Sequence, residues 1–281
     1  MFVRVATGLV LAPVLVWVVL WAPKTVMYSV LAFAAWRCTA ELLRMYRDMR
    51  TLDRVVCEVL TVGVALAPLL GPNLWPVAVA LGTLGTLTIA LWRVDDAGTA
   101  ARRAGLGVLA IGYVGVLIGA LVAIFGRAAL PVAGPVHLGD IALGPFDEGR
   151  GALMGTFVIV FAGDTGAYFA GRGFGRRRFH PLVSPKKTVE GSIGGLIASM
   201  AAGLFTIWAL VPGGPVLSGL ALGAAVGTAG QLGDLAESLF KRATDTKDSG
   251  SLLPGHGGML DRVDGVLFGG AVVQAWLALR G

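Results

Sequence analysis

The sequence predicts an all-α fold: a polytopic integral membrane helical bundle of about nine transmembrane helices, with a cytoplasmic N-terminus. Composition is the first observation, since 56% of the 281 residues are hydrophobic, only 14% are charged, and the mean hydropathy is +0.77. A soluble chain is nearer half apolar and a quarter charged, so this excess is typical of a membrane protein. Secondly, apolar runs of about 17 to 22 residues recur, and such runs cross a bilayer core of roughly 30 Å as helices.

The apolar runs define the expected spans in chain order. We expect the first run to be retained rather than cleaved as a signal, because Pro13 interrupts it and no small-x-small cleavage site follows. The second run is short and begins after Pro23, so the first two could form one broken hairpin. The nine expected spans are residues 6–21, 24–36, 55–71, 74–92, 104–125, 152–171, 192–212, 215–233 and 264–280.

Lysine and arginine are unequally distributed between the two sides that nine spans create. Of the 23 basic residues, 19 fall on one side, and basic loops stay in the cytoplasm. The N-terminus is therefore expected inside and the C-terminus outside, with residues 126–150 forming an external loop. The basic side comprises Arg4 and the loops 37–54, 93–103, 172–191 and 237–264.

The expected spans divide the chain into two regions. Residues 1–150 hold about five spans and the external loop. Residues 151–281 hold about four spans and the polar cytoplasmic loops 172–191 and 237–264, and we expect them to be the catalytic transmembrane region.

Zinc and disulfide chemistry are disfavoured by the sequence. Cys38 and Cys57 provide neither a disulfide framework nor metal-ligand spacing. The chain also contains no HExxH motif and no paired histidines.

Two aspartates lie towards the cytoplasmic ends of apolar spans. Asp164 is in FAGDTGAYFAGR and Asp234 is in GTAGQLGDLAESLF. An ionised carboxylate there costs a few kcal/mol unless it faces a polar cavity, a cation or a metal. The glycines before Asp234, from Gly223 to Gly233, mostly share one helical face, which allows close helix packing or approach of a head group.

The polar segment after Asp234 combines carboxylates with basic groups. Asp234, Glu237 and Ser238 lie three or four residues apart and so share a helix face with Lys241 and Arg242. Next, KDSGSLLPGHGG is rich in glycine and predicts a loop with exposed N–H groups, a composition suited to phosphate. Magnesium typically takes one or two carboxylates together with phosphate oxygens, so this segment predicts a site for a divalent cation and a polyphosphate.

The upstream loop 172–191 adds a second basic element. GRGFGR lacks the third glycine of a dinucleotide-binding motif, and no strand is expected before it. In SPKKTVEG we expect a turn at Ser184-Pro185, after which Lys186 and Lys187 are candidates for phosphate binding.

The stretch SLFKRATDTKDSGSLLPGHGGMLDRVD, residues 238–264, resembles the signature of the phosphatidate cytidylyltransferases, also called CDP-diacylglycerol synthases. DTGAYFAGR at 164–172 and SPKKTVEG at 184–191 resemble the family's other motifs, although Val189 stands where the family usually has tryptophan. The resemblance implies an enzyme of the bacterial inner membrane with a cytoplasmic active site. Its reaction would convert CTP and phosphatidate into CDP-diacylglycerol and pyrophosphate.

The resemblance also implies roles for individual residues. The family's metal-binding aspartates correspond to Asp234 and Asp261, which implies Mg²⁺ as cofactor and leaves room for a second cation. Lys247, Asp248 and Asp264 join these two as expected catalytic residues. The expected partners are CTP, phosphatidate and membrane lipids, with a homodimer left open and no nucleic acid. The expected substrate-binding residues are Asp164, Tyr168, Lys186, Lys187, Ser238, Lys241, Arg242, His256 and Arg262.

Two alternative functions remain open on the sequence. A CTP-dependent polyprenol or phytol kinase would share the multi-span body, but the PGHGGxLDRxD ending argues against it. A cation transporter could use Asp164, Asp234 and Asp261 as ion sites, but the polar residues cluster on one side rather than at the midplane.

Overall fold

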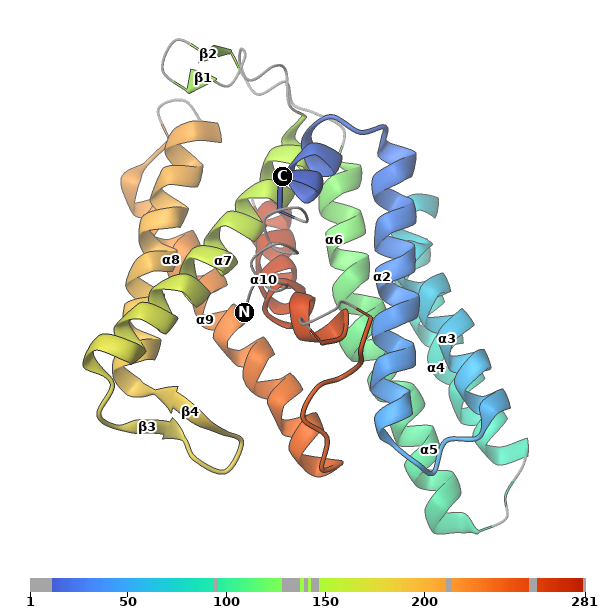
Figure 1. The fold of residues 1–281 in the computed structure, drawn as a ribbon. Coiled ribbons are helices and arrows are strands. Elements are labelled where there is room, and N and C mark those ends of the chain that lie inside the picture. The colour runs from blue at the N-terminus through green and yellow to red at the C-terminus, as the bar shows by residue number, and fades with distance from the viewer. Residues whose placement is uncertain are drawn as a thin grey trace. The chain divides into compact units, whose positions relative to one another are not determined.

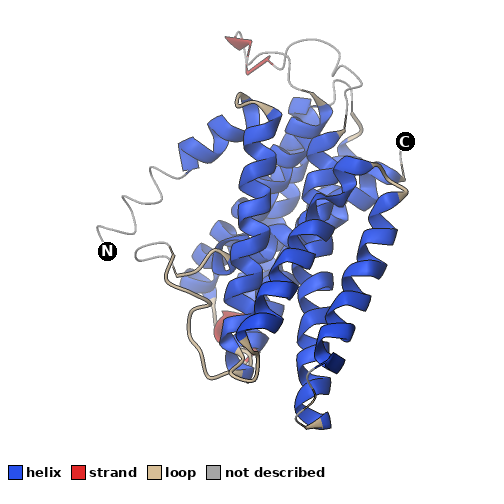
Figure 2. Cartoon of the chain, turned by 90° about the vertical axis from the view of Figure 1, so that its right-hand side faces the viewer, coloured by secondary structure: helices blue, strands red, loops and turns tan. Residues whose placement is uncertain are grey.

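The computed structural model describes residues 12–92, 94, 96–127, 137–138, 141–142, 147–210, 214–252 and 257–279. Helices account for most of this part of the chain, and the strands within it form two short antiparallel pairs (Figure 2). The described residues therefore confirm the prediction of a mainly helical protein.

The elements follow one another as shown in Figure 1. Residues 12–20 are helical and precede the first labelled helix. The helices are α2 (Lys24–Met45), α3 (Thr51–Leu66), the 3₁₀ turn η1 (Ala67–Leu70), α4 (Leu74–Trp92), α5 (Ala97–Leu109), the π-helical segment η2 (Ala110–Val116), α6 (Leu117–Gly126), α7 (Glu148–Phe174), α8 (Val189–Leu210), α9 (Val216–Ala243) and α10 (Leu260–Ala278). The strands are β1 (His137–Leu138), β2 (Ile141–Ala142), β3 (Arg178–His180) and β4 (Ser184–Thr188).

Six helical stretches in the described residues are long and apolar enough to cross a membrane. α10 has Asp261, Arg262 and Asp264 in its first turns and is not one of them, and α3 has only 16 residues. The chain is therefore an all-α membrane protein, while the count of nine spans stays a prediction. The six are α2, α4, Ala97–Gly126, α7, α8 and α9.

The bounds of the expected spans agree with the helices to different degrees. Span 74–92 coincides with α4. Span 24–36 is too short, because α2 continues to Met45 through what the sequence suggested was a loop. Arg37 and Glu41, one turn apart, form an ion pair of 3.2 Å on this extension, so the two charges belong to a helix.

The segment SPKKTVEG is also a correction to the sequence-based expectation. A turn was expected at Ser184-Pro185, whereas residues 181–183 form the turn and Ser184–Thr188 form strand β4. β4 pairs with β3, with Arg178 opposite Thr188 and His180 opposite Ser184. Lys186 and Lys187 consequently point to opposite faces of a strand.

The helices form two compact units. Unit 1 contains Ala22–Ala123 and Phe240–Val263, together with the N-terminal residues up to Val18. Unit 2 contains Ile124–Leu239 and the residues from Asp264 onwards, together with Val19–Trp21. The two units are defined by how the helices pack and not by function. The expected functional division into residues 1–150 and 151–281 therefore stays a prediction.

In unit 1, the connection between α2 and α3 is tied to the start of α5. Arg102 Nε lies 3.0 Å from Asp48 Oδ2, and Arg103 Nε donates to the Asp48 carbonyl oxygen at 2.7 Å. Arg103 also lies 3.9 Å from Asp53 on α3. Two segments expected as separate basic loops, 37–54 and 93–103, therefore meet at one end of this unit.

In unit 2, glycines bring α7, α8 and α9 into close contact. A Cβ on Gly163, Gly223 or Gly227 would collide with Ser199 of α8, through its hydroxyl, its backbone carbonyl or its side chain. Ser199 itself is buried and donates to the Ile159 carbonyl oxygen at 3.2 Å. The expectation that the glycine face of α9 serves close packing is confirmed at these positions.

Candidate active site

Helix α9 ends in a Schellman-type cap, and the polar loop follows it. Thr246 N–H donates to the Lys241 carbonyl at 2.9 Å and Asp245 N–H to the Arg242 carbonyl at 3.3 Å. Asp245 has a φ of +53°, the left-handed conformation that this cap requires, which aspartate tolerates better than most residues. The helix thus ends immediately after its basic pair, and Lys241 keeps a helical position from which its side chain reaches the loop.

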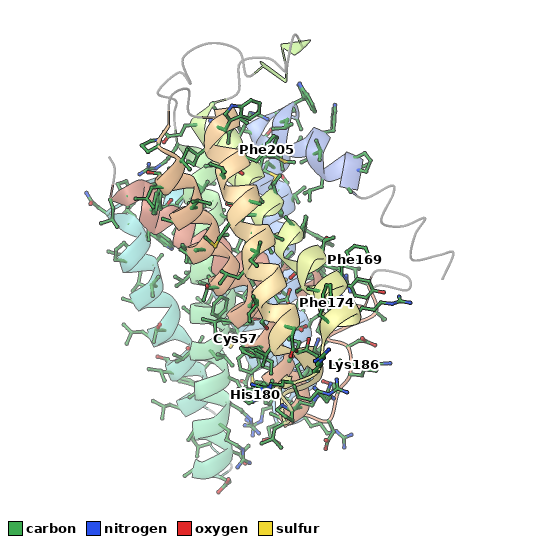
Figure 3. The ribbon with its side chains drawn as sticks, turned by 90° about the vertical axis from the view of Figure 1, so that its left-hand side faces the viewer. Cys57, Phe169, Phe174, His180, Lys186 and Phe205 are labelled. Atoms are coloured by element: carbon green, nitrogen blue, oxygen red, sulfur yellow. The ribbon has the colours of Figure 1, made fainter. Side chains whose placement is uncertain are left out.

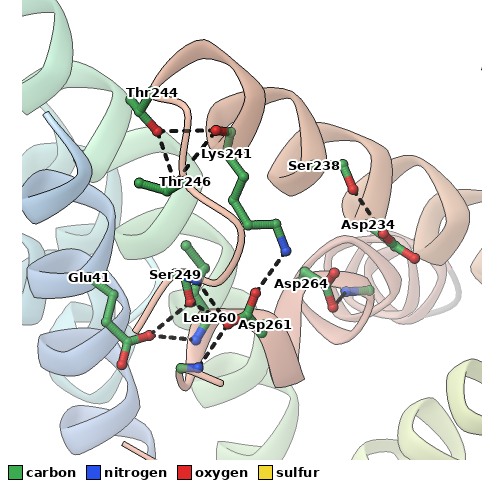
Figure 4. Close-up of polar contacts among 12 residues, drawn as sticks. Glu41, Asp234, Ser238, Lys241, Thr244, Thr246, Ser249, Leu260, Asp261 and Asp264 are labelled. Carbon is green, nitrogen blue, oxygen red and sulfur yellow. Dashed lines mark hydrogen bonds and ion pairs between the residues drawn. The ribbon is translucent and has the colours of Figure 1, made fainter. Parts of the chain in front are cut away.

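Asp261, at the start of α10, organises the loop within unit 1 (Figure 4). Its Oδ1 lies 2.7 Å from Lys241 Nζ. Its Oδ2 accepts hydrogen bonds from Ser249 N–H at 3.0 Å, Ser249 Oγ at 2.9 Å and Gly258 N–H at 2.8 Å. Asp261 thus gathers one lysine and two backbone amides around a carboxylate that is almost buried.

Glu41 of α2 lies beside this cluster and was not among the residues expected from the sequence. Its side chain is 2% exposed, and Oε2 accepts from the N–H of Leu260 at 2.9 Å. The Ser249 hydroxyl lies 3.3 Å from the same oxygen. A glutamate from the N-terminal part of the chain therefore contacts the loop that precedes Asp261.

Asp234, in unit 2, is the other expected metal ligand. Its Oδ2 lies 2.7 Å from Lys187 Nζ, and Ser238 Oγ donates to Oδ1 at 3.4 Å. Lys187 comes from strand β4, so the hairpin supplies a cation to α9. The Asp234 side chain is 36% exposed, which leaves it accessible to a ligand.

On α7, two candidates and an arginine recur every four residues and so share one helix face. These are Asp164, Tyr168 and Arg172. Arg172 Nη1 donates to the Tyr168 hydroxyl at 2.9 Å, and the Tyr168 side chain is exposed. The DTGAYFAGR motif thus presents its polar groups as one stripe.

Asp264 lies one turn after Asp261, at the point where α10 packs against α9 in unit 2. Its Oδ1 accepts from Gly265 N–H at 2.8 Å. A Cβ on Gly233 would collide with the Asp264 carbonyl oxygen, so the residue before Asp234 contacts the backbone of Asp264.

The remaining candidates are basic or acidic side chains at exposed positions. Figure 3 labels Lys186 of β4 and His180 of β3, and the Lys186 side chain is exposed. His256 lies outside the described residues. The other exposed candidates are Arg242, Lys247, Asp248 and Arg262.

The carboxylates can be compared with what a magnesium ion requires. No group of three or more His, Cys, Asp or Glu side chains in the described part of the chain could hold a metal by itself. Magnesium, however, typically uses one or two carboxylates and completes its shell with water and phosphate oxygens. Asp234 fits this role through a side chain that is 36% exposed. Asp261 fits through Oδ1, which faces Lys241 Nζ, because three donors already surround its Oδ2.

Glu41 and Ser249 are the residues that sequence reasoning missed. The available signal was Glu41 itself, a carboxylate in the stretch AAWRCTAELL with Arg37 one turn earlier. A charge inside an apolar helix is costly unless it is paired, and such residues usually have a function. Ser249 gave no comparable signal, because a serine in a glycine-rich loop is common.

Part of this chain is similar to curated phosphatidate cytidylyltransferases. A phosphatidate cytidylyltransferase of Bacillus subtilis (strain 168) is 48% identical over 112 residues, covering 40% of this chain and 41% of that protein. One of Haemophilus influenzae is 46% identical over 116 residues, and one of Synechocystis sp. is 43% identical over 134 residues, covering 40% and 45% of those proteins. The matched stretches thus cover less than half the length of these relatives.

The whole chain is covered by a broader comparison. The model of the Cytidylyltransferase family matches residues 2–279, which include every helix and strand described above. The chain therefore belongs to the cytidylyltransferase family.

Proposed function

We propose that this protein transfers the cytidylyl group of CTP to phosphatidate, giving CDP-diacylglycerol and pyrophosphate. The observation that carries the proposal is the 43–48% identity to relatives named phosphatidate cytidylyltransferase. The aspartate–lysine pairs provide the groups that such a reaction uses, namely carboxylates for a cation and ammonium groups for phosphates.

The chemistry is an in-line displacement at phosphorus. An oxygen of the phosphatidate phosphate forms a bond to the α-phosphorus of CTP, and the bond from that phosphorus to the β-bridging oxygen breaks. Pyrophosphate leaves with the electron pair. The nucleophile is already an anion, so orientation and neutralisation of charge contribute most of the rate.

The proposed roles follow from the contacts. Asp234 and Asp261 would hold Mg²⁺, which when bound would neutralise negative charge on the CTP phosphates. Lys187 lies 2.7 Å from Asp234 and Lys241 lies 2.7 Å from Asp261, and each lysine would supply positive charge to a substrate phosphate. Asp164 and Tyr168 would border the same site, and a second cation stays part of the proposal.

Apart from Lys187 and Lys241, the described basic residues that we assign to phosphate binding are exposed. Arg242, Lys247 and Arg262 are charged side chains near the two carboxylate-bearing helix ends, and Lys186 is exposed on β4. Ser238, His256, Asp248 and Asp264 complete the proposed set. Residues 151–281 would accordingly form most of the catalytic region.

We further propose nine spans in the bacterial inner membrane, with the N-terminus and the active site on the cytoplasmic side. In unit 1, contacts join three segments expected on that side: Asp48 to Arg102, and Glu41 to Ser249 and Leu260. Their meeting at one end of the unit supports the proposed orientation. Membrane lipids would then surround the apolar helix faces, and a homodimer is included as a proposed assembly.

Labelling of single cysteines tests the orientation. Ser251 and Val216 are exposed, and Ser251→Cys and Val216→Cys can be made in a background with Cys38 and Cys57 replaced by alanine. An impermeant maleimide should label Cys at position 251 only in inside-out vesicles and at position 216 only in right-side-out vesicles. The opposite pattern would show that the proposed orientation is wrong.

The activity is tested with purified protein, [α-³²P]CTP and phosphatidate. Radioactive lipid together with released pyrophosphate supports cytidylyl transfer, and loss of product in EDTA with recovery across a Mg²⁺ titration supports the metal. Label retained in CDP, with phosphorylation of an added polyprenol, would instead support the kinase. Ion flux in liposomes without CTP turnover would support the transporter.

A further inference from the structure

The contacts of Glu41 carry an inference about the site that neither the family nor the relatives' names supply. Glu41 lies on α2, and a carboxylate that is 2% exposed is strongly destabilising unless charges and donors surround it. Arg37 provides one partner, with Nη2 3.2 Å from Oε1. The partners of Oε2 come from the far end of the chain, through Leu260 N–H and Ser249 Oγ.

Two glycines of the loop, Gly250 and Gly258, leave the room that the Glu41 side chain occupies. A Cβ on Gly250 would lie 2.8 Å from Glu41 Cδ, and a Cβ on Gly258 would collide with Glu41 Oε2 and the Ser249 hydroxyl. A side chain at either position would require the loop or the Glu41 side chain to shift. Two glycines therefore allow the backbone to close against the carboxylate.

Ser249 links Glu41 to Asp261. Its hydroxyl lies 2.9 Å from Asp261 Oδ2 and 3.3 Å from Glu41 Oε2, while its N–H donates to Asp261 as well. Glu41 meanwhile accepts from Leu260, the residue directly before Asp261. Its charge also stabilises the positive N-terminal end of α10, where Asp261 lies.

We infer that Glu41 is a positioning residue, which fixes the loop and the first turn of α10 so that the Asp261 carboxylate is held for the reaction. The inference rests on the proposed function for the part played by Asp261. Glu41 acts through Ser249 and Leu260 and does not itself contact substrate. The geometry of the loop is an independent part of the inference and can be measured without any activity.

Hydrogen exchange measures the geometry. In Glu41→Ala, amides of a peptide covering residues 246–262 should exchange about tenfold faster or more, because hydrogen bonds to charged groups are lost. Glu41→Gln should fall between Glu41→Ala and the wild type, since its amide oxygen still accepts from Leu260 N–H. The matched control is Glu58→Gln, because Glu58 lies on neighbouring α3 and accepts from Trp36 Nε1 at 2.9 Å, away from the loop.

Kinetics measure the consequence. Glu41→Ala should lower kcat by about 10- to 100-fold, and raise the Mg²⁺ concentration for half-maximal activity, as expected when the support of a ligand is removed. Glu58→Gln should match the wild type. Unchanged exchange in Glu41→Ala would overturn the inference, and so would faster exchange with an unchanged kcat.

Two further results separate the inference from the proposed function. A folded wild type that makes no CDP-diacylglycerol would refute the proposed function, whereas the exchange comparison would still decide whether Glu41 holds the loop. If Glu41→Ala does not insert, Ser249→Ala removes only the linking hydroxyl and should give the same faster exchange and lower kcat. Wild-type behaviour of Ser249→Ala and Glu41→Gln together would contradict the inference.

Discussion

Lys187 Nζ lies 2.7 Å from Asp234 Oδ2, so an ion pair joins strand β4 to helix α9. The two side chains are 26% and 36% exposed, and pairs of this kind contribute only about 0 to 1 kcal/mol to stability. Breaking the pair therefore costs little, and in the proposed reaction its two groups would contact a cation and a phosphate instead. Its value to the protein is the placement of the lysine next to the carboxylate.

Replacing Lys187 tests this placement. Lys187→Met keeps much of the side-chain length but removes the charge, and kcat/KM for CTP should fall about 10- to 100-fold, as for the loss of a charge-assisted hydrogen bond. Lys186→Met should cause a smaller loss, because Lys186 lies on the other face of β4 and is exposed. Equal losses in the two variants would show that only the total charge of the hairpin matters.

The two aspartates should respond differently to the same substitution. Asp234→Asn and Asp261→Asn should each abolish turnover in the radiolabel assay, because each removes negative charge from the proposed cation site. Asp234→Asn should leave the melting temperature close to that of the wild type, whereas Asp261→Asn should lower it, since Asp261 holds Lys241, Ser249 and Gly258. Near-normal activity of either variant would refute its assignment.

Gly258 is expected to accept no side chain. Gly258→Ala brings a methyl group against Glu41 and Ser249, and overpacking of this kind typically costs about 1–3 kcal/mol. Thermal unfolding should show this loss together with reduced activity. Gly105→Ala is the control, because a Cβ there meets no atom within 4 Å, and it should be neutral or stabilising.

Asp96 should make stability depend on pH. It caps α5, and the hydrogen bond from Thr99 N–H at 2.8 Å lowers the pKa of its carboxyl group. A lowered folded-state pKa gives stabilisation that is complete above the unfolded-state pKa and is lost as pH falls through the folded-state value. Asp96→Asn keeps an acceptor but does not titrate, so the melting-temperature advantage of the wild type should disappear at acid pH; an advantage that is constant with pH would contradict this.

The sequence predicted the local features of the fold best. Span 74–92 coincides with α4, because glycine and proline precede a long uncharged run. The predicted end of the second span at residue 36 is wrong, because Arg37 and Glu41 pair along a helix that continues to Met45. The turn near Ser184 was also misplaced, since strand pairing between β3 and β4 depends on residues on both sides of it.

The candidate site was predictable where a motif brings its own residues together. Lys241 and Asp261 both belong to the 238–264 signature, and they form an ion pair. Lys187 and Asp234 were both expected to act at the site, but their pairing is a tertiary contact that no spacing reveals. Glu41 could not be assigned, because Ser249 and Leu260 follow it by 208 and 219 residues.

These separations also bear on the order in which the protein is made. Arg37 is available to Glu41 as soon as α2 forms, so a neutralised pair can enter the membrane early in synthesis. The donors from Ser249 and Leu260 are translated only 208 and 219 residues after Glu41. In a nascent chain, α2 is therefore present before the groups that bind Glu41 Oε2, and these contacts can form only after residues 249–260 have been translated.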